Sequence, residues 1–231
     1  MMKRILITGA SRGIGRAIAE KLAAPGVTLL LHGRDTIALA ETCKSVQSSG
    51  AAVVKLIHDL AMPEGVSDLV SEVGDDPLNI LVNNAGIAVV KPFREITLTE
   101  WHQTLGVNVT APFLLTQGFA GQMPPGSSIV NILSVAAKTG FPGWSSYCMS
   151  KFALEGFFQS VREELREHKI RVINIYPAAT NTEIWNNVEG DWPRNKMISA
   201  EQVASAVVYA LSRPAGVAVE NITLSSATGN L

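Results

Sequence analysis

TGASRGIG, at Thr8–Gly15, follows the apolar run Arg4–Thr8 directly and leads into a helical pattern. Gly9 would permit a tight turn, Gly13 would let the backbone approach a phosphate closely, and Gly15 would let the helix pack against the strand. A helix that opens here offers unpaired N–H groups and the positive end of its dipole to an anion. An ordinary glycine-rich turn is the alternative, but the strand–turn–helix context favours a pyrophosphate site.

The rest of the chain alternates short apolar runs with longer amphipathic stretches. We expect strands at Arg4–Thr8, Val27–His32, Val53–His58, Asn79–Asn83, Ser128–Ser134, Arg171–Tyr176 and Ala218–Leu224. We expect helices at Gly13–Ala24, Thr36–Ser48, Pro63–Val73, Thr99–Gly121, Ser145–His168 and Ala200–Ser212. Most strand-like runs are nearly continuous in Ile, Val and Leu, as in parallel strands buried on both faces. The pattern predicts an α/β fold with a single doubly wound, mostly parallel seven-stranded sheet and helices on both faces.

No repeat, low-complexity tract or linker interrupts this alternation, so we expect one domain over residues 1–231. The least regular segment is Thr182–Met197, which mixes Trp185, Trp192 and Pro193 with polar residues. Ligands of such sheets bind beyond the carboxyl ends of the strands. We therefore expect a substrate loop at 182–198.

Composition narrows the class of protein. Charged residues make up 17% of the chain, below the roughly 25% of an average domain, which indicates much buried surface. A net charge of −1 gives no reason to expect nucleic acid or an anionic membrane as partner. Cys43 and Cys148 form no spaced metal or disulfide pattern, so we expect no metal and a reducing, cytoplasmic setting. MMKRILITG leads straight into a strand and no apolar run approaches about 20 residues, so we expect neither signal peptide nor membrane span.

The end of the second strand bears on the choice between NAD and NADP. An acid there would hydrogen-bond the ribose 2′-hydroxyl of NAD, but VTLLLHGRD places Arg34 at this point. Arg34 and Arg12 could hold a 2′-phosphate through charge-assisted bonds. Asp35 lies past the strand end, where we expect it to cap the helix beginning at Thr36. NADP(H) is favoured and NAD(H) is possible; two merely solvated arginines are the alternative.

SSYCMSKFALEG places Tyr147 and Lys151 four residues apart in a helical pattern, so their side chains share a face. A cationic Lys beside a phenol makes the phenolate less costly to form. Bringing the pKa of a Tyr from about 10 to neutrality takes roughly 4 kcal/mol of differential electrostatics. The YxxxK spacing alone is a weak signal, and it gains weight from the glycine-rich turn upstream.

These motifs together resemble the short-chain dehydrogenase/reductase family, in its compact single-domain form, over essentially the whole chain. The matching stretches occur in the family's order: TGASRGIG, His58–Leu60, NNAG at Asn83–Gly86, Asn108 in LGVNVTAPF, Ser134 in VNILSVAA, the Tyr147 and Lys151 pair, and PAATNT at Pro177–Thr182. Each match alone is weak, but the ordered set is specific. Ala178 stands where the family usually has Gly. The ending VAVENITLSSATGNL lacks the Gly-Gly segment common in the fatty-acid-synthesis ketoreductases.

The resemblance implies a Rossmann-like NAD(P)-binding domain. Asp59 would contact the adenine ring, NNAG would stabilise the sheet and line the cofactor, and Pro177–Thr182 would hold the nicotinamide carboxamide. The cofactor-binding residues expected in this way are Gly9, Ser11, Arg12, Gly13, Ile14, Gly15, Arg34, Asp59, Leu60, Asn83, Ala85, Gly86, Tyr147, Lys151, Pro177, Ala178, Thr180 and Thr182.

The resemblance also implies reversible hydride transfer between the nicotinamide and a ketone or alcohol. Tyr147 would act as general acid and base, and Lys151 would lower its pKa and hydrogen-bond the nicotinamide ribose. Ser134 would polarise the carbonyl oxygen, and Asn108 would hold a water that links Lys151 to solvent. Plainer alternatives are a strand-end cap for Ser134, a mid-helix irregularity for Asn108 and helix packing for Tyr147.

The expected substrate contacts are Ser134, Phe141, Trp144 and Trp185. Further candidates are Val89, Val90, Phe93, Val135, Ala136 and Trp192. Such a wall is largely apolar and suits a medium-sized, uncharged ketone or diketone, with the irregular loop as a lid. Packing of Trp144 or Trp185 at a subunit interface is the alternative.

Apolar residues along Thr99–Gly121 and Ser145–His168 exceed what one sheet face would cover. In the resembled family such helices pair across a two-fold axis, so we expect a homodimer or homotetramer. The favoured interpretation is an NADPH-dependent carbonyl reductase or alcohol dehydrogenase acting on a small molecule.

A 3-oxoacyl reductase acting on acyl-carrier-protein or CoA thioesters is the alternative, and Arg194 with Lys196 would be a thin basic patch for the carrier. A non-catalytic nucleotide-binding sensor or scaffold is less favoured, because the Asn, Ser, Tyr and Lys of the family's set are all present. An epimerase or dehydratase usually needs a larger substrate domain than 231 residues allow.

Overall fold

The computed structural model describes residues 3–214, 216–227 and 229. Seven parallel strands form one sheet in the order β3-β2-β1-β4-β5-β6-β9. The strands are β1 (Lys3–Ile7), β2 (Val27–His32), β3 (Ala52–Leu56), β4 (Ile80–Asn83), β5 (Ser128–Ile132), β6 (Arg171–Pro177) and β9 (Asn221–Leu224). The predicted seven-stranded doubly wound sheet is confirmed, and all of its pairings are parallel.

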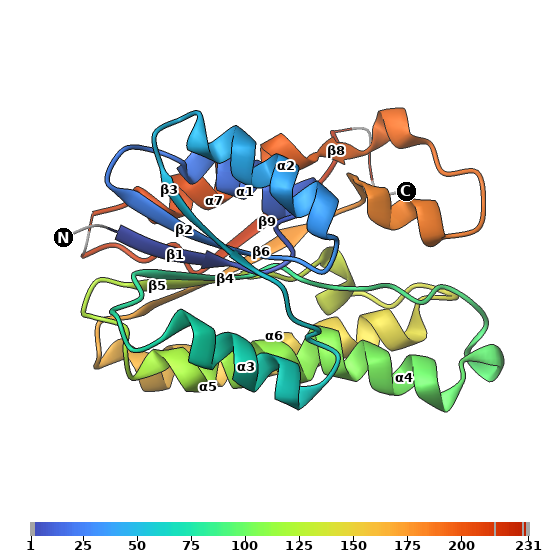
Figure 1. The fold of residues 1–231 in the computed structure, drawn as a ribbon. Helices are drawn as coiled ribbons and strands as arrows, with labels where there is room; N and C mark the ends of the chain where they lie inside the picture. Colours follow the sequence, from blue (N-terminus) through green and yellow to red (C-terminus); the bar gives the residue numbers. More distant parts are fainter. Residues whose placement is uncertain (1–2, 215, 228, 230–231) are drawn as a thin grey trace.

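Helices cover both faces of the sheet (Figure 1). On one face lie α1 (Gly13–Leu22), α2 (Thr36–Gln47) and α7 (Ala200–Leu211), and on the other α3 (Pro63–Val73), α4 (Leu98–Leu105), α5 (Ala111–Ala120) and α6 (Ser145–Arg166). Successive strand residues supply the two cores in turn: Ile5 and Ile7 pack under α1, whereas Leu6 packs on the α3 side. This alternation follows from the two-residue period of a strand.

The predicted helix Thr99–Gly121 is divided into α4 and α5 by a π turn at Gly106–Thr110. Pro112 explains the division, because it has no N–H to donate to the carbonyl of Asn108, four residues earlier. The Ala111 N–H instead reaches the Gly106 carbonyl, five residues back. The helix widens for one turn at this point, a distortion frequent at functional sites.

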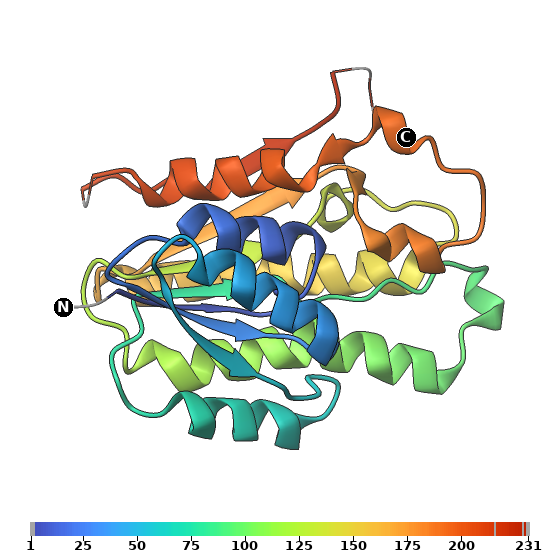
Figure 2. The same cartoon turned by 45° about the horizontal axis from the view of Figure 1, so that its top comes forward.

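The segment between β6 and α7 contains a pair of short strands that the sequence did not predict. Strands β7 (Thr180–Asn181) and β8 (Ile198–Ser199) pair with each other and close the loop between them. Short 3-10 helices lie within this loop at η4 (Glu183–Asn187) and η5 (Arg194–Lys196), and elsewhere at η1 (Phe93–Glu95) and η3 (Val135–Ala137). Figure 2 shows this orange segment beyond the carboxyl ends of the strands. No helix in the described part of the chain is long and apolar enough to cross a membrane.

Candidate active site

The glycine-rich turn after β1 adopts a geometry that requires glycine. Gly9 and Gly13 have φ of 65° and 56°, a region that residues with a Cβ seldom enter. A Cβ on Gly15 would overlap the carbonyl oxygen of Gly9. The side-chain amide of Asn84 donates to the carbonyls of Thr8 (2.8 Å) and Gly9 (3.1 Å). The turn is therefore held rigidly against the end of β4, with α1 packed directly behind it.

A cleft of about 590 Å³ opens in front of this turn. The N-cap of α1, Arg12, makes no side-chain cap hydrogen bond, so the first N–H groups of the helix are left for a ligand. The cleft runs from the glycine turn past the ends of β2, β3 and β4. It is lined by Gly9, Ser11, Arg12, Gly13, Ile14, His32, Gly33, Arg34, Asp35, Asp59, Leu60, Asn84, Ala85, Gly86, Ile87, Ala88, Val107, Thr182, Glu183 and Ile184. Its shape and donors fit an extended phosphate-bearing ligand.

Two residues expected in the cofactor site line neither this cleft nor the cavity that adjoins it. Gly15 has no Cβ, and this lets α1 pack closely against the turn. Asn83 is buried within the sheet, where its amide donates to Asn131 Oδ1 at 2.9 Å. Its neighbour Asn84 lines the cleft instead. The resemblance implied that NNAG both stabilises the sheet and lines the cofactor; Asn83 lies within the sheet and Asn84 lines the cleft.

The charged groups at the end of β2 are arranged as the sequence predicted. Asp35 is the N-cap of α2, and its carboxylate accepts from the Ala38 N–H at 3.0 Å. The Arg34 guanidinium lies 3.6 Å from the Asp59 carboxylate, and both side chains are about half exposed. Arg12 is exposed at the start of α1. Two cationic side chains thus border the cleft, while the nearby carboxylate of Asp35 is used by the helix.

His32 is a cleft residue to which the sequence assigned no role. It is buried, and its Nδ1 accepts from the Gly9 N–H at 3.4 Å, which leaves Nε2 to donate to the His58 carbonyl at 3.0 Å. Burial lowers the pKa of His32 below its ordinary value. The neutral ring joins the glycine turn to the end of β3. The position of this His at the end of a buried strand could have indicated a role in the cleft.

A second cavity, of about 190 Å³, adjoins the cleft. Ile14, Asn84, Gly86, Thr182 and Ile184 line both, so a ligand in one reaches the other.

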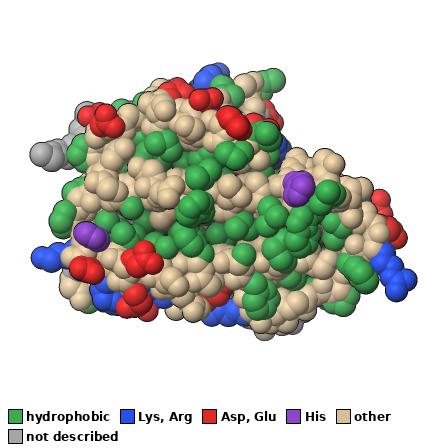
Figure 3. Space-filling view, turned by 90° about the horizontal axis from the view of Figure 1, so that it is seen from below, with side chains coloured by type: hydrophobic (Ala, Val, Ile, Leu, Met, Phe, Trp, Pro, Cys, Tyr) green, Lys and Arg blue, Asp and Glu red, His purple; other side chains and the backbone are tan. Residues whose placement is uncertain are grey.

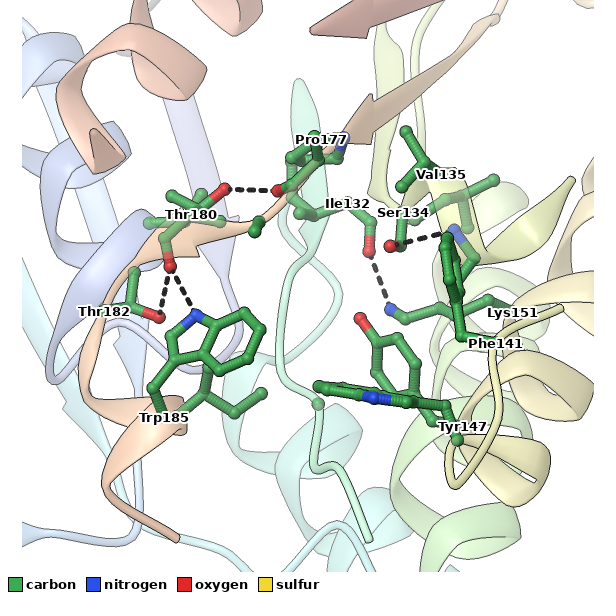
Figure 4. Close-up of a pocket in the computed structure, with 18 of the residues that line it drawn as sticks. Ile132, Ser134, Val135, Phe141, Tyr147, Lys151, Pro177, Thr180, Thr182 and Trp185 are labelled. Atoms are coloured by element: carbon green, nitrogen blue, oxygen red, sulfur yellow. Dashed lines mark hydrogen bonds between the residues drawn. The ribbon is translucent and has the colours of Figure 1, made fainter. Parts of the chain in front are cut away.

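The predicted residues Ser134, Tyr147, Lys151 and Thr180 line this second cavity (Figure 4). Lys151 is buried, and its ammonium donates to the Ile132 carbonyl at 2.9 Å and lies 5.6 Å from the centre of the Tyr147 ring.

The electrostatics of this cluster differ from the prediction. Burial raises the pKa of Tyr147 to about 12, and the nearby Ser134 side chain acts in the opposite direction. Burial also lowers the pKa of Lys151 to about 8. The pKa of Tyr147 is therefore raised in the protein alone, where the sequence predicted a depression towards neutrality, because burial removes water from around the phenolate.

Asn108 lies in the π turn and is buried beside the site. Its side chain is fully used: Oδ1 accepts from the Ile87 N–H, and Nδ2 donates to the Ile87 carbonyl, all at 2.9 Å. Nδ2 also donates to Ser150 Oγ at 3.0 Å, and Ser150 Oγ donates to the Tyr147 carbonyl at 2.7 Å. Asn108 thus ties the chain after β4 to the first turn of α6. Ser150 is a further residue that the sequence did not single out.

The expected substrate contacts also come together. Ser134, Phe141, Trp144 and Trp185 all line the smaller cavity, joined by Trp192. The candidates Val89, Val90 and Phe93 lie outside this lining, and Phe93 is largely exposed on η1. The remaining lining residues are Ile132, Leu133, Val135, Ala136, Pro177, Ala178 and Ala179.

The loop that carries Trp185 is fastened by Arg194. Its guanidinium donates to Asn181 Oδ1 (3.0 Å), the Thr182 carbonyl (2.7 Å) and Asn186 Oδ1 (2.8 Å). This cation therefore holds both ends of the loop together.

A parallel doubly wound sheet, a glycine turn at the N-terminus of α1 and a Ser–Tyr–Lys cluster in the adjoining cavity define a dinucleotide-dependent oxidoreductase. Residues 3–192 match the family model described as short chain dehydrogenase. The chain belongs to the short-chain dehydrogenase/reductase family.

Relatives with established names share this architecture. The chain is 35% identical over 222 residues to a 3-oxoacyl-acyl-carrier-protein reductase of Aquifex aeolicus, covering 90% of this chain and 89% of that one. A short chain dehydrogenase from Burkholderia cenocepacia in complex with NADP is 30% identical with a TM-score of 0.88, over 98% and 97% of the two chains. An alcohol dehydrogenase from Thermococcus sibiricus complexed with 5-hydroxy-NADP is 26% identical with a TM-score of 0.89, over 100% and 99%.

Proposed function

We propose that this enzyme is an NADPH-dependent carbonyl reductase that interconverts an uncharged ketone and its secondary alcohol. The observation that carries the proposal is the grouping of Ser134, Tyr147 and Lys151 in a cavity that shares its lining with the phosphate cleft. A carbonyl oxygen placed against Ser134 and Tyr147 lies within that cavity. The carbonyl carbon then faces the phosphate cleft, from which the nicotinamide ring would enter the cavity.

NADP(H) is the proposed cofactor, with NAD(H) as the weaker possibility. Support comes from the NADP bound in solved relatives and from Arg12 and Arg34 at the cleft. Asp35, the acid nearest the end of β2, is committed to the cap of α2. The expected contacts of the remaining cofactor residues, including Pro177, Ala178, Thr180 and Thr182, form part of this proposal.

Each side chain has a role in the reduction. When bound, the nicotinamide supplies the hydride that adds to the carbonyl carbon. Ser134 hydrogen-bonds the carbonyl oxygen as negative charge develops there. Tyr147, whose pKa of about 12 keeps it protonated at neutral pH, donates its proton to that oxygen. Lys151 is cationic below pH about 8 and stabilises the phenolate left behind. Asn108 positions the chain around Tyr147, and its carbonyl is the proposed anchor for a water beside Lys151.

Replacing the proton donor tests the proposal. We expect Tyr147→Phe to bind NADPH as the wild type does, because the ring is kept, and to lose ketone reduction by at least about 100-fold, the usual contribution of general acid catalysis. NADPH oxidation against a panel of ketones, diketones and aromatic aldehydes measures the loss, and fluorescence titration measures cofactor binding. Near-normal turnover in this variant would exclude Tyr147 as the acid.

Reduction of 3-oxoacyl thioesters is the second candidate, favoured by the relative of that name from Aquifex aeolicus. Against it stands the thin charge of the loop, where Glu183, Glu189 and Asp191 offset the two cations considered for a carrier protein. Acetoacetyl thioesters measured beside free ketones separate the two activities: a higher kcat/KM on the thioester would promote this candidate.

We also propose how the chain works as a unit. Residues 1–231 act as one domain, and 182–198 form the substrate loop. Two copies pair through the face formed by α4, α5 and α6, where hydrophobic side chains spread across the surface (Figure 3). Leu98, Phe113 and Phe152 are exposed on these helices. Both cysteines are free and buried, in keeping with the proposed cytoplasmic location.

A further inference from the structure

Three tryptophans form one continuous wall of the smaller cavity. Trp144 and Trp185 have ring centres 5.5 Å apart, Trp185 and Trp192 lie 4.9 Å apart, and Trp144 and Trp192 lie 6.2 Å apart. Trp144 also meets the Tyr147 ring edge to face at 5.6 Å. The wall therefore begins at the proposed proton donor and continues onto the substrate loop, which supplies Trp185 and Trp192.

This wall offers mainly ring surface, because two of its three indole N–H groups already have backbone partners. The indole N–H of Trp185 donates to the Thr180 carbonyl at 2.8 Å, and that of Trp192 to the Glu189 carbonyl at 3.1 Å. The Thr180 and Thr182 hydroxyls donate to backbone carbonyls as well. A hydroxyl-rich substrate would lose much of its water here for few new partners, which is costly. The part of the substrate beyond the carbonyl is thus apolar.

Charge in the cavity argues in the same direction. Among its described lining residues no side chain is acidic and Lys151 is the one cation. Aromatic cages also bind organic cations, but a second positive charge would be repelled by the Lys151 ammonium in the same small cavity. The occupant that remains is a neutral group able to use several ring edges and faces.

We propose that the substrate is an aryl ketone, with an aromatic ring directly attached to the carbonyl carbon or fused beside it. Trp144 lies next to Tyr147, so a ring directly bonded to the reacting carbonyl reaches the wall without a spacer. Edge-to-face contacts between aromatic rings are favourable beyond the area they bury. This inference rests on the proposed carbonyl reductase activity and narrows its substrate class.

The test compares two ketones of the same carbon skeleton, acetophenone and cyclohexyl methyl ketone. Their intrinsic reactivities differ, so the informative quantity is the ratio of their kcat/KM values in each variant divided by that of the wild type. Trp185→Phe and Trp185→Leu form a matched pair, because both lose the bond to Thr180 and only Phe keeps an aromatic ring. We expect the aryl preference to fall by about 2- to 12-fold in Trp185→Leu, the worth of one aromatic pair, and to be largely kept in Trp185→Phe.

Equal ratios in the Phe and Leu variants would overturn the inference while leaving carbonyl reduction intact. If Trp185→Leu does not fold, Trp192→Phe and Trp192→Leu replace the pair. If neither ketone is reduced, the proposed function fails separately, and quenching of tryptophan fluorescence by each ketone in the presence of NADPH decides the substrate class. Tighter binding of acetophenone supports the aryl pocket, and equal binding overturns it.

Discussion

Burying the charged side chain of Lys151 costs this enzyme free energy of folding. It is 5% exposed, and its one hydrogen bond in the described chain goes to the Ile132 carbonyl. Burial lowers its pKa from 10.5 to about 8, which corresponds to roughly 3 kcal/mol against the charged form. Because its burial destabilises the fold, Lys151 fits a catalytic role better than a stabilising one.

Lys151→Met should therefore stabilise the protein and abolish reduction. At pH 7 the lysine is protonated in both the folded and the unfolded chain, so the folded state carries the full cost of the buried charge. Removing it should raise the free energy of unfolding by about 2 kcal/mol, after about 1 kcal/mol is subtracted for the lost hydrogen bond. Urea denaturation at fixed protein concentration measures the change.

The pH dependence provides the control for this prediction. As pH rises from about 8 towards 10.5, the folded wild type releases the Lys151 proton before the unfolded chain does, and the cost fades. The advantage of Lys151→Met should shrink between pH 7 and pH 10. A variant less stable than the wild type at pH 7 would mean that the ammonium is a net stabilising group.

Cofactor preference also belongs to single residues. Arg12→Ala combined with Arg34→Ala should lower kcat/KM for NADPH at least about 10-fold, because a charge-assisted bond contributes about 1.5–3 kcal/mol. The same change should leave kcat/KM for NADH nearly unaltered, since its ribose carries no 2′-phosphate. Asp35→Ala serves as the matched control at the same strand end, and should weaken the cap of α2 without shifting the preference. An unchanged NADPH/NADH ratio in the double variant would contradict the assignment.

At the scale of elements, α1 must pack very closely against the glycine turn. A Cβ on Gly15 would overlap the Gly9 carbonyl, so Gly15→Ala must push α1 away from the turn. We expect a loss of stability of about 1–3 kcal/mol, typical of overpacking, together with weaker NADPH binding. Gly121→Ala is the control, because its Cβ would meet nothing within 4 Å and its φ of −69° suits alanine. Equal thermal midpoints for the two variants would show that α1 has room to adjust.

The sequence predicted the main elements well because buried parallel strands and amphipathic helices have strong periodic signals. Strand β2 and helix α3 have the predicted bounds. The π turn was missed because the apolar pattern continues through it, although Pro112 inside the predicted helix was a warning. The β7–β8 pair was missed because strands of two residues leave no periodic pattern.

The sequence predicted site residues well at strand ends and motif positions. It predicted them less well where a side chain can point either into the sheet or into the cleft. NNAG is an example: Asn83 joins an in-register ladder with Asn131 and Asn174 across β4, β5 and β6, while Asn84 faces the cleft. No local signal distinguishes the two. The pKa of Tyr147 likewise depends on its complete surroundings, which its spacing from Lys151 does not reveal.

The whole molecule has two unlike faces. On the face with α1, α2 and α7, exposed hydrophobic residues such as Ile37 are isolated. On the other face, α4, α5 and α6 expose the hydrophobic side chains of Leu98, Phe113 and Phe152. Phe113 on α5 meets Phe157 on α6 edge to face at 5.7 Å, so the two helices present one joined apolar surface. Surfaces of this kind on a soluble domain usually mark an interface, and an isologous pair places the same residues on both sides of a two-fold axis.

The combined variant Phe113→Glu and Phe152→Glu should therefore halve the mass of the assembly. Four carboxylates brought near one axis repel each other and lose water, whereas in a free subunit they face water. There the lost contact of Phe113 with Phe157 costs about 0.5–1.5 kcal/mol. Light scattering coupled to size-exclusion chromatography measures the mass, and Ile37→Glu on the opposite face is the control. An unchanged mass with a cooperative unfolding transition would place the interface elsewhere. Because the active-site helix α6 carries Phe152 one residue after Lys151, loss of pairing should also reduce kcat, which links assembly to catalysis.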